Sequence, residues 1–235
     1  MAVIWAMPRN VNAQLYVTNR AAGGNGLVRE YNATTGTAIS ATFITGLTNE
    51  IDFGLAVSGN TLFVTDATGF VGKYDATTGG AINASFITGL HDPFGLALLG
   101  NTLFVANSGS DTVGEYDAKT GAAINASFIT GLNGPTGLAV SGNKLFVAGF
   151  FNGTVGEYDA KTGAAINDSF ITGLHAPLGL ALLGNTLFVA NSNFISGTVN
   201  SGTVGEYDAT TGAAINASFI TGLTVPSGLA VKSAK

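Results

Sequence analysis

The feature that most constrains this chain is an internal repeat of about 42 residues. A tyrosine followed by Asp or Asn recurs with spacings of 43, 42, 42 and 49 residues, at Tyr31, Tyr74, Tyr116, Tyr158 and Tyr207. A phenylalanine in a Ser/Thr-Phe-Ile-Thr-Gly-Leu segment recurs with the same spacings, at Phe43, Phe86, Phe128, Phe170 and Phe219. A period of this length indicates similar structural units that stack on one another.

Each unit contains four short segments with the character of β-strands. In one unit they are GLAV (137–140), KLFVA (144–148), TVGEYD (154–159) and AAINDSFI (164–171). Runs of four to eight residues rich in β-branched and aromatic side chains, bounded by Gly, Asn and Asp, are typical of strands. Four strands in about 42 residues predict the blade of a β-propeller. The continuous apolar run LFVA further indicates a strand that is buried on both faces.

The two ends of the chain predict how the ring closes. The chain enters at the second landmark, QLYVTN (14–19), and leaves with an additional GLAV at 228–231. We therefore predict an all-β, five-bladed β-propeller with four antiparallel strands per blade, in which the C-terminal strand joins the N-terminal blade and removes the open sheet edges. A part of a larger ring is the alternative. The expected blades are 14–47 plus 224–235, 48–90, 91–132, 133–174 and 175–223.

Two motifs resemble known propeller repeats. LYVTN (15–19) is similar to the YVTN repeat, and PTGLAVSGNKLFVA (135–148) resembles the NHL repeat. The resemblance covers about residues 14–232 and implies a propeller, although those families usually have six or seven blades. It implies little about function, because such repeats serve many roles.

Composition and the N-terminus narrow the possible partners. The net charge is −5 and there is no basic run, which argues against nucleic acid as a partner. The chain has no cysteine, and its apolar run AVIWAM (2–7) is too short to span a membrane. We expect residues 1–13 to be a leader or a shortened signal peptide that ends at Ala13, and hence an extracytoplasmic protein. An ordinary leader or a short strand is the alternative.

The repeated Glu-Tyr-Asp looks like catalytic chemistry, but the repeat itself argues otherwise. The residue before Tyr is Glu in four units and Lys73 in one, so we expect this position to face solvent. The residue after Tyr is Asp in four units and Asn32 in one, which predicts a side chain that caps its own turn. The Asn-x-Ser/Thr matches belong to the repeat too, so glycosylation would occur only in a host that performs it; they are Asn32, Asn83, Asn125, Asn152, Asn167 and Asn216.

The units differ from one another most in two loops. The turns between the first and second strands and between the third and fourth barely change, and we call their side of the ring the uniform face. The loops before the first strand and between the second and third strands differ in every unit, and they share the opposite side, which we call the variable face. Because rigid scaffolds carry function on loops, we expect binding at the variable face.

The candidate binding residues all lie in the variable loops. They are Asp52, Phe53, Asp66, Phe70, His91, Asp92, Phe94, Thr136, Phe150, Phe151, His175, Leu178, Phe194 and Ser227. His91 and His175 occupy the same place in two units 84 residues apart, so we interpret them as inherited loop residues. A metal-binding or acid-base role for them is the alternative.

We expect a non-catalytic binding or scaffold protein that is a monomer and binds a protein, small molecule or glycan. No catalytic residue, cofactor or metal is assigned. One alternative is a lectin-like propeller. The other is a metal-dependent hydrolase or lyase resembling gluconolactonase, which would need carboxylates at the mouth of the channel. The residues before the first-strand glycine are Phe53, Phe94, Thr136, Leu178 and Ser227, and only Asp52, one step earlier, is acidic.

Overall fold

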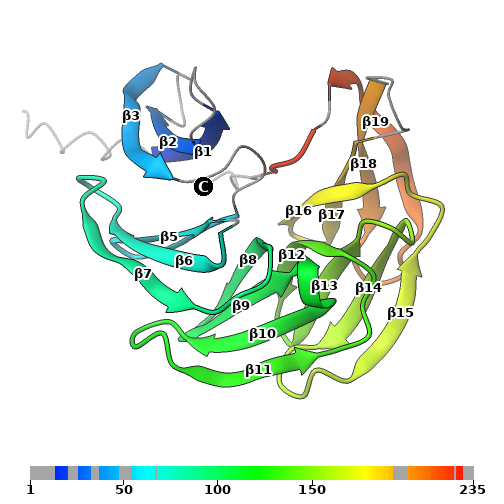
Figure 1. The fold of residues 1–235 in the computed structure, drawn as a ribbon. Coiled ribbons are helices and arrows are strands. Elements are labelled where there is room, and N and C mark those ends of the chain that lie inside the picture. The colour runs from blue at the N-terminus through cyan, green and yellow to red at the C-terminus, as the bar shows by residue number, and fades with distance from the viewer. Residues whose placement is uncertain are drawn as a thin grey trace, which may run out of the picture.

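Nineteen strands and a single 3-10 helix make up the described part of the chain in a computed structural model (Figure 1). The structure describes residues 14–20, 26–32, 37–47, 54–66, 68–192, 201–224 and 226–229. Within these ranges no helix is long and apolar enough to cross a membrane. The strands form five antiparallel sheets that follow one another around a common centre. The protein is therefore an all-β, five-bladed β-propeller, as predicted.

The first two sheets come from the N-terminal part of the chain. Blade 1 contains β1 (Gln14–Arg20), β2 (Gly26–Asn32) and β3 (Ala38–Leu47). Blade 2 contains β4 (Leu55–Ser58), β5 (Thr61–Asp66), β6 (Phe70–Asp75) and β7 (Ala81–Thr88).

The remaining three sheets each have four strands in sequence order. Blade 3 contains β8 (Pro93–Leu99), β9 (Thr102–Asn107), β10 (Thr112–Asp117) and β11 (Ala123–Ile129), with the 3-10 helix η1 (Ser108–Ser110) before β10. Blade 4 contains β12 (Pro135–Ser141), β13 (Lys144–Gly149), β14 (Thr154–Asp159) and β15 (Ala165–Ile171), where the four segments were predicted. Blade 5 contains β16 (Pro177–Leu183), β17 (Thr186–Asn191), β18 (Ser201–Asp208) and β19 (Ala214–Thr224).

Blade 1 differs from the prediction. Its sheet has three strands in the described part of the chain, and residues 226–229 belong to no strand. They nevertheless reach the centre of the ring, as the red segment after β19 in Figure 1 shows. There Ser227 and Leu229 lie against Gly179, as Leu178 and Leu180 lie against Gly137. Residues 227–229 thus take the fifth inner position without pairing to β1, and 230–235 lie outside the described residues.

The core lies between neighbouring blades. The second strand of each complete blade is buried on both faces, and Leu103, Phe104, Val105 and Ala106 are all 0% exposed. One apolar cluster joins Phe63 of blade 2 to Tyr116 of blade 3. Each large apolar side chain buried in this way stabilises the fold by about 1.5–3 kcal/mol, so the stacking of blades holds the ring together.

One glycine in or directly before the inner strand of each of blades 2 to 5 allows the inner strands of adjacent blades to lie close together. The glycine of each Gly-Leu-Ala segment faces the backbone of the next inner strand; these residues are Gly54, Gly95, Gly137 and Gly179. A methyl group on Gly137 would lie 2.9 Å from the amide nitrogen of Leu180 and closer still to the carbonyl oxygen of Leu178. Real Cβ atoms essentially never come within 3.0 Å of such atoms, so only glycine fits. We infer that this close approach provides the tight curvature of a five-bladed ring.

Candidate functional site

The uniform face is held together by one repeated contact. In blade 3 the side-chain amide of Asn101, in the turn between the first two strands, donates to Asp117 Oδ2 over 2.5 Å. The equivalent pairs are Asn60–Asp75, Asn143–Asp159 and Asn185–Asp208. The invariance of these turns therefore has a structural cause.

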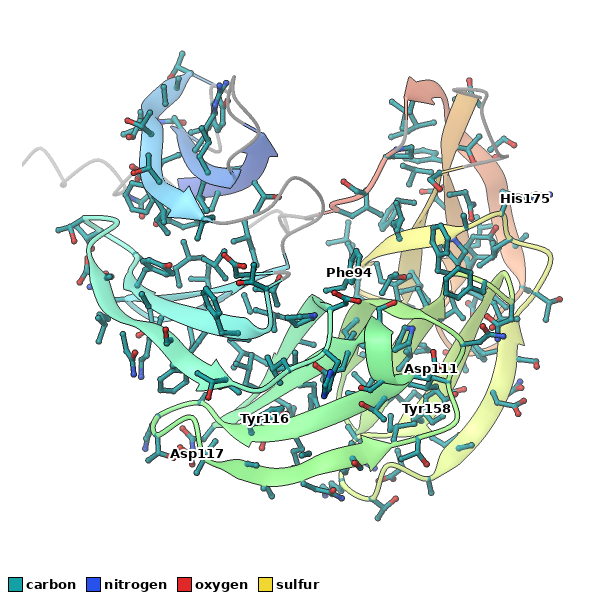
Figure 2. The ribbon with its side chains drawn as sticks, viewed as in Figure 1. Phe94, Asp111, Tyr116, Asp117, Tyr158 and His175 are labelled. Atoms are coloured by element: carbon teal, nitrogen blue, oxygen red, sulfur yellow. The ribbon has the colours of Figure 1, made fainter. Side chains whose placement is uncertain are left out.

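The aspartate after each tyrosine caps its own turn, as predicted. Asp117 Oδ1 accepts hydrogen bonds from the backbone N–H groups of Thr120 (2.7 Å) and Lys119 (2.9 Å) and from the Thr120 hydroxyl (2.9 Å). The Thr120 backbone bond is the main reason that the pKa of this carboxyl lies below its usual value. Asp75, Asp159 and Asp208 are held in the same way, with lowered pKa values. Figure 2 shows Asp117 and Asp111 at opposite ends of β10, on the uniform and variable sides.

The expectation that the residue before tyrosine faces solvent is wrong. Glu157 is only 3% exposed, and its carboxylate lies 2.5 Å from the ammonium group of Lys144. Lys73 donates to the carbonyl oxygens of Ala118 and Lys119 in the next blade, at 3.3 and 3.2 Å. In blade 3, burial raises the pKa of the Glu115 carboxyl. Lys73 thus connects two blades, whereas Glu157 pairs with a lysine of its own blade.

The tyrosine of the motif is an interior residue. Its ring folds back over the glycine two positions earlier, and a methyl group on Gly114 would lie 2.5 Å from the Tyr116 ring. Burial raises the pKa of the Tyr116 phenol, although a hydrogen bond with Asn107 partly opposes this. In blade 1, Arg29 replaces the glycine, and Tyr31 is only half-buried. Each residue of Glu-Tyr-Asp thus has contacts within the propeller that account for its place in the repeat.

The Asn-x-Ser segments have a structural role as well. Asn125 Oδ1 accepts a hydrogen bond of 3.1 Å from the backbone N–H of Ser127, within an irregularity in the pairing of β10 and β11. The same bond forms at Asn83, Asn167 and Asn216. Bulges of this kind on an outer strand disfavour pairing with other chains.

A central cavity of about 550 Å³ brings together four of the predicted binding residues. Phe94, Thr136, Leu178 and Ser227 all line it, and the first three lie near the start of β8, β12 and β16 at the variable end. Figure 2 shows Phe94 near the centre of the ring. The Thr136 hydroxyl donates a hydrogen bond of 2.9 Å to the carbonyl oxygen of Pro177, so its proton is engaged within the protein. No Asp, Glu, Lys, Arg or His lines the cavity within the described residues.

Asp66 and Phe70 do not reach this cavity. Asp66 is 1% exposed, and its carboxylate accepts hydrogen bonds from the backbone N–H and the hydroxyl of Thr68, at 2.9 and 2.6 Å. It therefore shapes the loop between β5 and β6. Phe70 is half-buried at the start of β6.

The two histidines and Asp92 are exposed and lie outside the cavity lining. His175 lies far from Phe94 in Figure 2. Across the ranges that the structure describes, no three His, Asp or Glu side chains come together as a metal site requires. Asp92 and Ala176, each directly before a proline, have positive φ angles of 44° and 48°. Asp52, Phe53 and Phe194 lie outside the described residues.

Phe150 and Phe151 form a separate aromatic pair in the loop between β13 and β14. Their ring centroids are 5.1 Å apart, and the rings are perpendicular. Phe150 is half-buried, whereas Phe151 is 72% exposed. The predicted residues therefore divide between the cavity, this pair and loop positions with other contacts.

Sequence reasoning missed part of the cavity wall. The leucine after each first-strand glycine also lines it, as do residues 15–18 of β1; the leucines are Leu55, Leu96, Leu138, Leu180 and Leu229. The signal was available in the Gly-Leu-Ala segments, because an inner strand borders the channel along its whole length. The predicted residues came only from the loop before each segment.

Comparisons with known proteins support the propeller. The sequence model of a family described as outer membrane protein assembly factor BamB matches residues 24–123, which is less than half of the chain. This match supports a BamB-like propeller repeat in that stretch. No curated protein matches the sequence.

Several solved structures resemble this fold. The hydrazine synthase of Kuenenia stuttgartiensis is 21% identical with a TM-score of 0.58, and the match covers 70% of this chain but only 47% of that one. A chain of a nidogen/laminin complex is 15% identical with a TM-score of 0.58, and 92% of this chain and 97% of that chain are covered. The computationally designed Ika8 protein is 16% identical with a TM-score of 0.53, covering 94% and 78%. Likeness at these identities shows the fold alone.

Proposed function

We propose that this protein is a non-catalytic binding propeller whose variable face receives an uncharged, mainly apolar group. That group is a small molecule or apolar side chains of a partner protein. The observation that carries the proposal is the central cavity, where Phe94, Thr136, Leu178 and Ser227 converge. Ligand sites are typically concave, mostly apolar and set in rigid scaffolds, and the uniform turns keep this scaffold rigid.

The chemistry of the cavity wall supports this class of ligand. Its side chains are chiefly leucines and Phe94, and the Thr136 hydroxyl is engaged with Pro177. A charged ligand would lose its hydration without gaining an oppositely charged side chain among the described residues of the wall, which costs several kcal/mol. An apolar ligand gains about 25 cal/mol for each Å² of surface that it buries.

The test uses the neutral dye N-phenyl-1-naphthylamine, whose fluorescence rises in apolar surroundings. We expect saturable binding by the wild-type protein and roughly tenfold weaker binding or worse by Phe94→Asp, because a carboxylate is placed at the cavity wall. Lys161→Gln, on the uniform face, makes the same change of −1 in net charge and should bind as the wild type does. Equal affinities for all three proteins, or no saturable binding by the wild type, would refute the proposal.

We also propose an extracytoplasmic location. It is supported by the expected leader at residues 1–13 and by the partial match to an outer membrane assembly factor. The measurement is the intact mass of the protein recovered from cell fractions of the source organism. A chain that begins at Gln14 in an extracytoplasmic fraction agrees with the proposal, and an intact N-terminus in the cytoplasm contradicts it.

A further inference from the structure

The most exposed large apolar side chain in the described part of the protein is Phe151. It is 72% exposed and lies in the loop between β13 and β14, on the variable face of blade 4. It does not line the central cavity. An aromatic ring in this position contributes little to the core, so its exposure needs another explanation.

Phe151 is held by contacts within its own loop and with the loop before β12, which is itself bound to blade 3. Its ring packs perpendicular to that of Phe150, with centroids 5.1 Å apart. The backbone N–H of Phe150 donates to the carbonyl oxygen of Gly134 over 2.9 Å, and that of Phe151 donates to Asn133 over 3.4 Å. Gly134 itself donates to Asp111 Oδ1 of blade 3 over 2.8 Å. A rigidly held ring loses little conformational entropy on binding, which favours a role as an anchor.

Gly134 is the residue that makes room for the ring. Its φ angle is +58°, and a methyl group there would lie 2.5 Å from Phe151 Cδ2. The equivalent loops of blades 3 and 5 have Asp92 and Ala176 at this position. Blade 4 thus combines a glycine with two adjacent phenylalanines, a combination absent from the other loops before a proline.

The charges around the pair are of one sign. In blades 3 and 4 the variable loops contain Asp92 and Asp111, both exposed, and no Lys or Arg. The basic residues of these blades are Lys119, Lys144 and Lys161, which lie in or beside the turns of the uniform face. A partner on the variable face therefore meets an apolar ring within an acidic surface, and charge complementarity calls for basic groups on that partner.

We propose that Phe151 is the anchor of a protein-docking surface, and that it inserts into an apolar pocket rimmed by Lys or Arg on a partner protein. Anchors of this kind are buried aromatic side chains surrounded by a polar rim, here provided by Asn133, Asn152 and Asp111. A sugar is less well matched, because the two perpendicular rings form a protruding knob and not a flat stacking surface. A second copy of the chain would bring two acidic faces together.

This inference rests on the proposed use of the variable face, but not on the cavity. The two therefore fail separately: loss of dye binding leaves Phe151-dependent docking unaffected, and the reverse also holds.

The experiment places the photo-cross-linker p-benzoyl-phenylalanine at position 151 of the full chain. The control carries it at position 124, because Ile124 is 56% exposed on the outer strand β11. After irradiation in extract of the source organism, the cross-linked peptides are sequenced and the partner is purified. We expect Phe151→Ser to weaken its binding at least about 30-fold. Ile124→Ser should bind within about twofold of the wild type, and wild-type affinity should fall as salt is raised.

A folding defect is separated by thermal denaturation, since Phe151→Ser should melt close to the wild type. Support requires a cross-link that maps to an apolar pocket with basic residues at its rim. The proposal is overturned if position 151 captures nothing beyond position 124, or captures only a second copy of this chain. Binding to a glycan array that disappears in Phe151→Ser would also overturn it in favour of sugar stacking.

Discussion

Replacing Gly137 by alanine tests how the inner strands determine the ring. The added methyl group would lie 2.9 Å from the Leu180 amide nitrogen and even closer to the Leu178 carbonyl oxygen. Both are backbone atoms of β16, so no side chain can rotate away, and blade 5 must move relative to blade 4. Overpacking a well-packed core costs typically 1–3 kcal/mol and occasionally more. We expect the upper end of this range, about 3 kcal/mol.

The assay is thermal and urea denaturation. For a chain of this size, 3 kcal/mol corresponds to a fall in Tm of roughly 6–12 °C. The matched control is Gly80→Ala, because Gly80 is exposed and its nearest neighbour would be the Thr78 hydroxyl at 3.2 Å. This variant should melt within about 2 °C of the wild type. If Gly137→Ala also melts within 2 °C, the blades can separate at little cost and our account of the ring's curvature is wrong.

Three further predictions concern the repeated turns and the stacking of blades. The pKa of Asp159 is lowered, so its ionised cap stabilises the fold above about pH 4, and this contribution is lost as the pH falls further. In urea denaturation at several pH values, Asp159→Asn should therefore lose less stability below pH 4 than the wild type does. Ala176→Gly should raise stability by about 0.5–1 kcal/mol by calorimetry, because its φ of 48° suits glycine; an unchanged or lower Tm contradicts this. Glu157→Gln should lower the free energy of unfolding by about 1–2 kcal/mol in urea denaturation, because it breaks the ion pair with Lys144. Glu115→Gln should lower it by less. Equal losses of stability in the two variants would exclude the ion pair as the cause.

Much of the fold could be predicted because the repeat encodes local properties. The Gly-Asn turns and the Asp117 cap each depend on residues within one blade, and the continuous apolar run around Leu103 already indicates a strand buried on both faces. The burial of Glu157 could not be predicted in this way, since its partner Lys144 stands where the other four-stranded blades have threonine. Lys73 at the same position suggested solvent, yet its ammonium group binds carbonyl oxygens of blade 3.

The candidate site was predicted less completely for the same reason. Phe94, Thr136, Leu178 and Ser227 converge because equivalent positions of a ring meet at its axis. Asp66 was placed in the correct loop, but its carboxylate turns inward to Thr68. The sequence grouped Phe150 with Phe151, and only the packing against Gly134 distinguishes the covered ring from the exposed one.

The most direct test of the central claim locates the bound ligand. Trp5 is the chain's only tryptophan, so Trp5→Phe combined with Phe94→Trp gives a single reporter at the cavity, and Trp5→Phe with Lys161→Trp gives one on the uniform face. Energy transfer from tryptophan to N-phenyl-1-naphthylamine is then measured during titration. We predict saturable transfer that is much stronger in the Phe94→Trp variant than in the Lys161→Trp variant. Equal or stronger transfer from the uniform face, or none from the cavity, would contradict binding at the variable face.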